Sequence, residues 1–231
     1  MTAVLEARGL EAGYGGRPAI HGVDVAVAEG EITVLLGPNG AGKSTTVLAL
    51  AGVLAPLGGS VRWDGKPTRT RLHRRARLGL SLVTEERSVI RALSVRDNLR
   101  LGCRVEDALA LFPELEPLLD RPAGLVSGGE QQMVTLARAL ARRPRVVLVD
   151  ELSLGLAPMV VDRLFRALRR AADDGVGVLL VEQHVRKALT LADWAHVLRR
   201  GRIELSGSAA DLRARPGDIE QHYLAANGAS S

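Results

Sequence analysis

Short apolar runs recur along the chain, and glycine, proline or charged residues bound each of them. Continuous runs of about five residues are typical of parallel strands covered on both faces, and helical spacing fills the segments between them. The pattern predicts a turn at 57–60, strands at 32–36, 61–65, 78–83, 146–150, 176–181 and 195–199, and helices at 158–173 and 185–192. This alternation predicts an α/β fold with a mostly parallel sheet and flanking helices.

The first 30 residues follow a different pattern. Between Val23 and Val27, valines alternate with polar or small residues, which is the period of a strand with one buried face. An earlier strand begins near Val4, so residues 1–30 are predicted to form a mainly antiparallel β region with a turn at 13–17. Tyr14 lies in this turn, where its ring is either presented to a ligand or is an ordinary turn residue.

A helical segment interrupts the α/β pattern. Ser94 is a suitable N-cap for a helix that runs to Leu101, and a second helical pattern covers 107–112. Three prolines then break the chain, at Pro113, Pro117 and Pro122. We therefore predict a helical subdomain inserted at about residues 88–143, with the core resuming after it.

A glycine-rich stretch directly after the strand at 32–36 matches the phosphate-binding loop pattern G-x-x-x-x-G-K-[ST]. Its residues are Gly37, Pro38, Asn39, Gly40, Ala41, Gly42, Lys43 and Ser44, with Thr45 opening the predicted helix. Glycines allow backbone N–H groups to surround a phosphate, and the helix start adds a positive dipole end. Lys43 would reach the β- and γ-phosphates, and the Ser44 hydroxyl would ligate Mg²⁺. The loop predicts a site for a nucleoside triphosphate such as ATP.

Two adjacent carboxylates, Asp150 and Glu151, end the buried strand at 146–150. Ligands of open α/β sheets bind at the carboxyl ends of the strands. Asp150 would hold Mg²⁺ opposite Ser44, and Glu151 would orient the water that attacks the γ-phosphate. A polar strand end without catalytic function is the alternative.

The segment Ser127-Gly128-Gly129-Glu130-Gln131-Gln132 precedes a helix with apolar periodicity. Ser127 and Glu130 have the spacing of a capping box. The two glycines leave the first N–H groups of the helix open to an anion, so Ser127, Gly128, Gly129 and Glu130 are predicted to contact a phosphate. A plain helix cap would account for Ser127 and Glu130 alone.

Charge and composition exclude several classes of protein. The net charge is +5, and the densest arginine run, residues 69–77, is predicted to be a solvated helix face. No aromatic residues interleave with these arginines, so a nucleic-acid partner is not expected. No apolar run reaches the about 18 residues of a membrane span, and the first residues lack signal-peptide features. The single cysteine, Cys103, fits the cytosol.

Together these motifs resemble those of the ATP-binding cassette (ABC) family, in the same order and over essentially the whole chain. The resemblance relates Gly37–Ser44 to the Walker A loop, Val146–Asp150 to the Walker B strand, Glu151 to the catalytic glutamate, Ser127–Gln131 to the signature motif and Tyr14 to the aromatic that stacks on adenine.

The resemblance implies how such a chain works. Residues 1–231 would form a single ABC ATPase domain that binds ATP and Mg²⁺. Two cassettes would pair head to tail, so that the signature helix of one closes on the γ-phosphate held by the other. It also implies integral-membrane permease subunits, contacted by the loop after Glu85, and a position at the cytoplasmic face of the membrane. A substrate-binding protein would act only indirectly.

Four positions depart from the family pattern. Glu85 stands where the family has Gln, a position that would contact the metal. The switch histidine aligns with Gln183, but His184 follows it, so the switch role is open between the two. Leu152 replaces the proline after the catalytic glutamate, and Ala157 replaces the D-loop aspartate.

Two stretches, Val83–Arg87 and Glu151–Pro158, resemble the shorter ATPase subunit of branched-chain amino acid importers, and Leu180–Gln183 fits that group as well. Importers of urea or short amides share much of this pattern. The resemblance to branched-chain amino acid importers therefore implies an ATP-hydrolysing importer subunit that pairs with a second, different ATPase.

Other classes stay open. A soluble cassette ATPase for DNA repair or translation would carry coiled-coil insertions or a second cassette, which this chain lacks. A P-loop kinase would leave Ser127–Gln132 unexplained. A non-catalytic cassette that only binds nucleotide would account for the unusual residues at 157 and 183.

Overall fold

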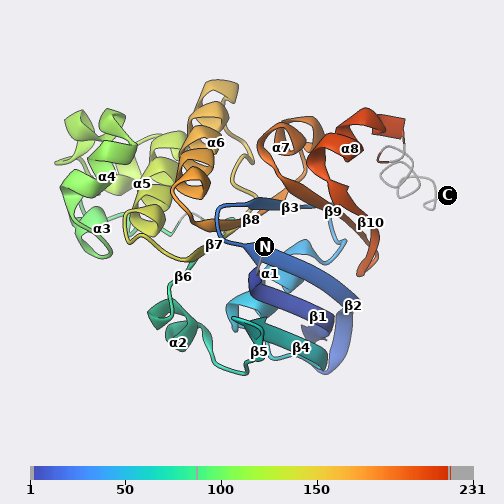
Figure 1. Ribbon diagram of the computed structural model, residues 1–231. Coiled ribbons are helices and arrows are strands. Elements are labelled where there is room, and N and C mark those ends of the chain that lie inside the picture. Colours follow the sequence, from blue (N-terminus) through green and yellow to red (C-terminus); the bar gives the residue numbers. More distant parts are fainter. Residues whose placement is uncertain (1–2, 87, 218, 220–231) are drawn as a thin grey trace.

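Figure 1 shows a computed structural model of the chain, which describes residues 3–86, 88–217 and 219. A six-stranded sheet forms its centre, in the order β10-β9-β3-β8-β7-β6. Its strands are β3 (Ile32–Leu36), β6 (Leu80–Val83), β7 (Val146–Asp150), β8 (Gly177–Glu182), β9 (Trp194–Arg199) and β10 (Arg202–Ser208). All neighbours pair in parallel except β9 and β10, which confirms the predicted α/β fold with a mostly parallel sheet.

A second sheet is antiparallel and has the order β2-β1-β4-β5. It is formed by β1 (Ala3–Tyr14), β2 (Arg17–Ala28), β4 (Gly58–Trp63) and β5 (Lys66–Pro67). The pairing of β1 with β2 confirms the antiparallel arrangement expected near the N-terminus. The turn is shorter than predicted: Gly15 and Gly16 alone form it, both with positive φ, and Tyr14 is the last residue of β1.

The helices complete the fold. They are α1 (Lys43–Ala51), α2 (Leu72–Arg77), α3 (Val95–Arg100), α4 (Val105–Leu111), α5 (Gly128–Leu140), α6 (Pro158–Asp173), α7 (Val185–Leu191) and α8 (Ala209–Ala214), with 3₁₀ turns at Pro113–Leu118 and Ala123–Leu125. Ser94 caps α3 by accepting a hydrogen bond from the Asp97 N–H, as predicted. In Figure 1, α3, α4 and α5 lie together on one side of the molecule, with α6 next to them.

Both faces of the central sheet are buried, which explains its continuous apolar strands. Leu148 of β7 joins the core that contains α1 and the antiparallel sheet, whereas its neighbour Val147 joins the core under α5 and α6. Leu179 and Leu180 of β8 divide in the same way. Helix α1, with the preceding loop, is therefore held between the two sheets (Figure 1).

The turn predicted at 57–60 is wrong, because β4 already begins at Gly58. Its glycines serve close strand packing: a Cβ at Gly59 would overlap the backbone carbonyl of Gly9. The strand predicted at 61–65 is the second half of this β4, which ends at Trp63.

The arginine run at 69–77 is only partly a solvated face. Arg69, Arg71, Arg74 and Arg77 are exposed, but Arg75 is buried, with 1% of its surface accessible. Its guanidinium donates hydrogen bonds to the carbonyls of Thr70, Ala49 and Leu50, and so caps the C-terminal end of α1. Burial lowers the pKa of Arg75 to about 10.

Strand β10 and helix α8 were not predicted. Arg200 and Gly201 both have positive φ and form the two-residue turn from β9 to β10, a geometry that favours glycine. Within the described residues, no helix is both long and apolar enough to cross a membrane. Arg87, from the Val83–Arg87 motif, lies outside these residues, and the insert boundaries at about 88 and 143 stay a prediction.

Candidate functional site

Three neighbouring parallel strands end at one edge of the central sheet. Leu36 of β3 pairs with Glu182 of β8, and Asp150 of β7 pairs with Val181 of β8. The glycine loop, the acidic pair and the segment that contains Gln183 therefore start from the same edge. This is the edge at which open α/β sheets bind ligands.

The loop from Gly37 to Gly42 has a shape that only glycine permits at its ends. A Cβ at Gly37 would overlap the carbonyl oxygen of Leu198. Gly42 is the N-cap of α1 with a φ of 106°, and a Cβ there would lie 2.6 Å from Cγ2 of Ile20. Between them, the tip at Asn39 and Gly40 is exposed, whereas Ala41, and Thr45 beyond the loop, are buried.

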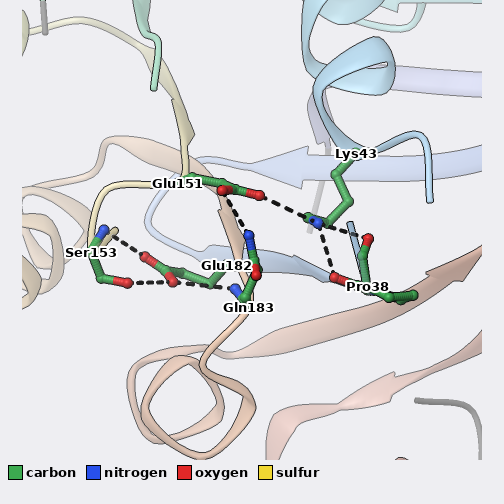
Figure 2. A network of polar contacts seen from close by, with 7 residues as sticks. Pro38, Lys43, Glu151, Ser153, Glu182 and Gln183 are labelled. Carbon is green, nitrogen blue, oxygen red and sulfur yellow. Dashed lines mark hydrogen bonds and ion pairs between the residues drawn. The ribbon is translucent and has the colours of Figure 1, made fainter. Parts of the chain in front are cut away.

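Lys43 is almost completely buried and points back toward its own loop (Figure 2). Its ammonium donates hydrogen bonds to the carbonyl oxygens of Gly37, at 2.9 Å, and Pro38, at 3.0 Å. The same Nζ lies 3.4 Å from Oε1 of Glu151. These partners occupy the ammonium in this conformation, so a phosphate has to compete with Glu151 for it.

Glu151 is held from two sides. Its Oε1 faces Lys43, and its Oε2 accepts a hydrogen bond of 2.8 Å from Nε2 of Gln183 (Figure 2). Its φ is 49°, a left-handed conformation that costs roughly 1–3 kcal/mol for a non-glycine residue and is common at functional sites. Of the two candidate switch residues, the structure places Gln183 against Glu151, whereas His184 is an exposed residue at the start of α7.

Asp150 and Ser44 form a suitable pair of magnesium ligands. Burial raises the pKa of Asp150, while a hydrogen bond from the Ser44 hydroxyl acts in the opposite direction. Oδ1 of Asp150 is buried and has no hydrogen-bond partner among the described residues. A buried carboxylate oxygen without a partner is costly, and a cation would satisfy it. The donor set therefore fits Mg²⁺.

Glu85 lies close enough to Asp150 for its charge to raise the pKa of Asp150 further. It lines a cavity of about 390 Å³ together with Glu151 and with Gln131 and Gln132 of α5. The two glutamines were predicted only as part of the 127–132 segment, not as site residues. Their position beside Glu151 depends on how α5 packs, which local sequence does not reveal.

The capping box at Ser127 and Glu130 is present as predicted: each side chain accepts a hydrogen bond from the backbone N–H of the other. Gly129 has a packing role, because a Cβ there would lie 2.9 Å from Cγ1 of Val160 in α6. Ser127 is exposed, and Figure 1 shows α5 apart from α1. Among the described residues, no hydrogen bond or ion pair joins Ser127 or Glu130 to the phosphate loop at 37–44.

Tyr14 is the last residue of β1, with 56% of its surface exposed. An exposed ring at a hairpin end is free to contact a flat ligand. Its predicted stacking on adenine stays a prediction.

Comparisons with known proteins identify the family. The family model described as ABC transporter matches residues 20–153. The high-affinity branched-chain amino acid transport ATP-binding protein BraG of Pseudomonas aeruginosa is 39% identical, over 91% of this chain and 95% of its own. The lipopolysaccharide export system ATP-binding protein LptB of Escherichia coli is 34% identical, over 91% of this chain and 92% of its own.

A solved structure of an ATP-binding subunit of an ABC transporter is 27% identical and covers 96% of each chain, with a TM-score of 0.79. The chain is thus similar to these proteins over most of its length, and to the solved structure in its fold. It belongs to the ABC transporter family as an ATP-binding subunit, an ATPase whose ATP hydrolysis is coupled to transport.

Proposed function

We propose that this chain energises the uptake of branched-chain or other hydrophobic amino acids, with Glu151 as its catalytic residue. The observation that carries the catalytic part is the contact of Glu151 with both Lys43 and Gln183, at 3.4 Å and 2.8 Å. The substrate class rests on BraG, and on the Ser-Leu-Gly-Leu-Ala-Pro stretch at 153–158. A urea or short-amide importer, or a soluble ABC ATPase, is the alternative.

In this proposal ATP takes over the contacts of Lys43. The β- and γ-phosphates draw the ammonium away from the carbonyls of Gly37 and Pro38 and from Glu151, and the loop N–H groups bind the phosphate oxygens. Glu151, released from Lys43 and still held by Gln183, orients the attacking water and accepts its proton. Mg²⁺, held by Ser44 and Asp150 with Glu85 nearby, would neutralise charge on the phosphates.

A second cassette supplies the rest of the site. Because Ser127 is exposed and its hydrogen bonds stay within the capping box, we propose that Ser127–Glu130 closes on the triphosphate held by a partner ATPase, with a heterodimer favoured. A Gly128→Asp change would set a carboxylate against the incoming γ-phosphate. It should leave ATP binding intact and abolish ATP-dependent pairing in analytical ultracentrifugation; normal pairing would contradict this arrangement.

Permease subunits would dock at the cytoplasmic face of the membrane, on a groove between α2, β6 and α5. The groove has a volume of about 590 Å³ and combines apolar with cationic side chains, including Leu72, Leu101, Arg77, Arg138 and Arg142. Ser88, just beyond the loop after Glu85, also lines it. A permease segment with leucine-like and acidic side chains would complement such a surface.

The test is to co-purify the chain with its membrane subunits and reconstitute them in vesicles. ATPase activity is then measured with the binding protein and leucine, isoleucine or valine, and separately with urea, short amides or lipopolysaccharide. Branched-chain amino acids should stimulate hydrolysis, and Lys43→Ala should abolish it. Stimulation by one of the other substrates alone would reject the proposed substrate class, and failure to associate with any membrane subunit would favour a soluble ATPase.

A further inference from the structure

The carboxylate of Glu182 is buried at the end of β8, one residue before Gln183, with only 1% of the residue exposed. Its Oε1 accepts a hydrogen bond from the Ser153 backbone N–H at 3.1 Å. Its Oε2 accepts one from the Ser153 hydroxyl at 2.7 Å and a longer one from the Gln183 N–H at 3.3 Å. Figure 2 shows these contacts next to Glu151.

A buried charge at this position is costly, since burial alone raises the pKa of Glu182. Among the described residues, the hydrogen-bond donors to this carboxylate come from two segments only: the loop after Glu151, through Ser153, and Gln183 itself. The Glu182 carboxylate therefore connects the loop that follows Glu151 to Gln183, whose side-chain amide contacts Glu151. An apolar side chain in place of Glu182 would fill the same space but would not connect these two segments.

We propose that Glu182 and Ser153 are a pair of positioning residues that direct the Gln183 side-chain amide toward Glu151. This rests on the proposed catalytic role of Glu151. Gln183 lies at the strand end, where its backbone direction decides where its side chain points. The Glu182 carboxylate restrains that backbone through the Gln183 N–H, and Ser153 restrains the carboxylate.

Glu182 and Ser153 are connected to the phosphate-binding residues only indirectly, and kinetics can detect this. No hydrogen bond of the described residues joins Glu182 or Ser153 directly to Lys43 or to the phosphate loop; the connection runs through Gln183 and Glu151. Loss of the Ser153 hydroxyl should therefore reduce kcat and leave the KM for ATP unchanged. The free energy of a hydrogen bond to a charged group is equivalent to a change in a rate constant of about tenfold or more, so we expect kcat to fall by at least that factor.

The test compares Ser153→Ala with Ser153→Thr in the full chain, with its membrane subunits where they are needed for activity. Ser153→Ala should lower kcat about tenfold. Ser153→Thr keeps the hydroxyl, and a cavity of about 510 Å³ beside Ser153 gives room for the added methyl group, so it should restore most of kcat. Thr33→Val is the matched control, because Thr33 of β3 also carries a buried hydroxyl, which donates a hydrogen bond to the Ala26 carbonyl of β2.

A double-mutant cycle separates positioning from simple destabilisation. In a Gln183→Ala background, Ser153→Ala should cause no further loss of kcat, because the amide that it positions is absent. Glu182→Gln replaces one of the two acceptor oxygens by an NH₂ donor, so either the Ser153 N–H or the Gln183 N–H loses its acceptor, and the change should cost as much as Ser153→Ala or more. Equal kcat for Ser153→Ala and Thr33→Val, or independent losses in the cycle, would overturn the proposal. Failure of the proposed function is distinguishable, since it would appear as full hydrolysis by Glu151→Gln.

Discussion

The ion pair between Lys43 and Glu151 predicts that neutralising Glu151 strengthens ATP binding. The two charged atoms are 3.4 Å apart, and the side chains are 4% and 11% exposed. At an effective dielectric constant of about 20 the attraction is about 5 kcal/mol, but desolvation of both groups offsets most of it. Lys43 also keeps its two loop carbonyls. We therefore expect Glu151→Gln to release about 1 kcal/mol, which is about fivefold tighter binding.

The assay is titration calorimetry with a non-hydrolysable ATP analogue, so that turnover does not affect the affinity. Because the pair is shielded from solvent, the gain should persist in high salt, unlike that from a surface charge. Glu86→Gln is the matched control, because Glu86 lines the same cavity of about 390 Å³ as Glu151 but forms no ion pair with Lys43. Unchanged or weaker binding by Glu151→Gln, or an equal gain from Glu86→Gln, would refute the competition between Glu151 and phosphate.

Three further predictions concern the scaffold. Burial lowers the pKa of His196 to about 4, so its contribution to stability is present above pH 6.5 and is lost as the pH falls. In urea unfolding, the wild-type chain should therefore lose about 2 kcal/mol more than His196→Gln between pH 7.5 and 5. If the free energy of unfolding of the two proteins fell in parallel with pH, this would be contradicted. Gly129→Ala should lower the melting temperature by about 2–4 °C through contact with Val160, and adding Val160→Ala should restore most of it; no rescue would place the strain elsewhere. Arg75→Met should lower the free energy of unfolding in urea by about 3 kcal/mol, because three backbone carbonyls lose their hydrogen-bond donor. Arg74 is exposed, so Arg74→Met should cost under about 0.5 kcal/mol. Equal losses for the two variants would reject a capping role for Arg75.

Features that depend on local spacing could be predicted from the sequence. The glycine loop before α1, the acidic pair that ends β7 and the capping box of Ser127 each lie within a few residues of chain. Their chemistry fixes the residue types that can occupy them, so pattern and structure agree. The continuous apolar strands also indicated the parallel sheet, because a sheet buried on both faces shows no alternation.

Features set by tertiary packing could not be predicted. Arg75 stands among exposed arginines and has no local mark of burial, because the carbonyls that it caps come from α1 and the segment before α2. The glycines of β4 suggested a turn, but they allow contact with β1. The buried bond between Glu182 and Ser153 joins residues that are 29 positions apart. The sequence also left Gln183 and His184 equivalent until packing placed Gln183 on Glu151.

Whether Glu151 activates the attacking water is decided by measuring phosphate release from Mg·ATP for the wild-type chain and for Glu151→Gln, side by side at high protein concentration. Both proteins should bind ATP, and the variant should release phosphate roughly 10²–10⁴ times more slowly. Equal rates of release would contradict the role of Glu151 as the residue that activates water.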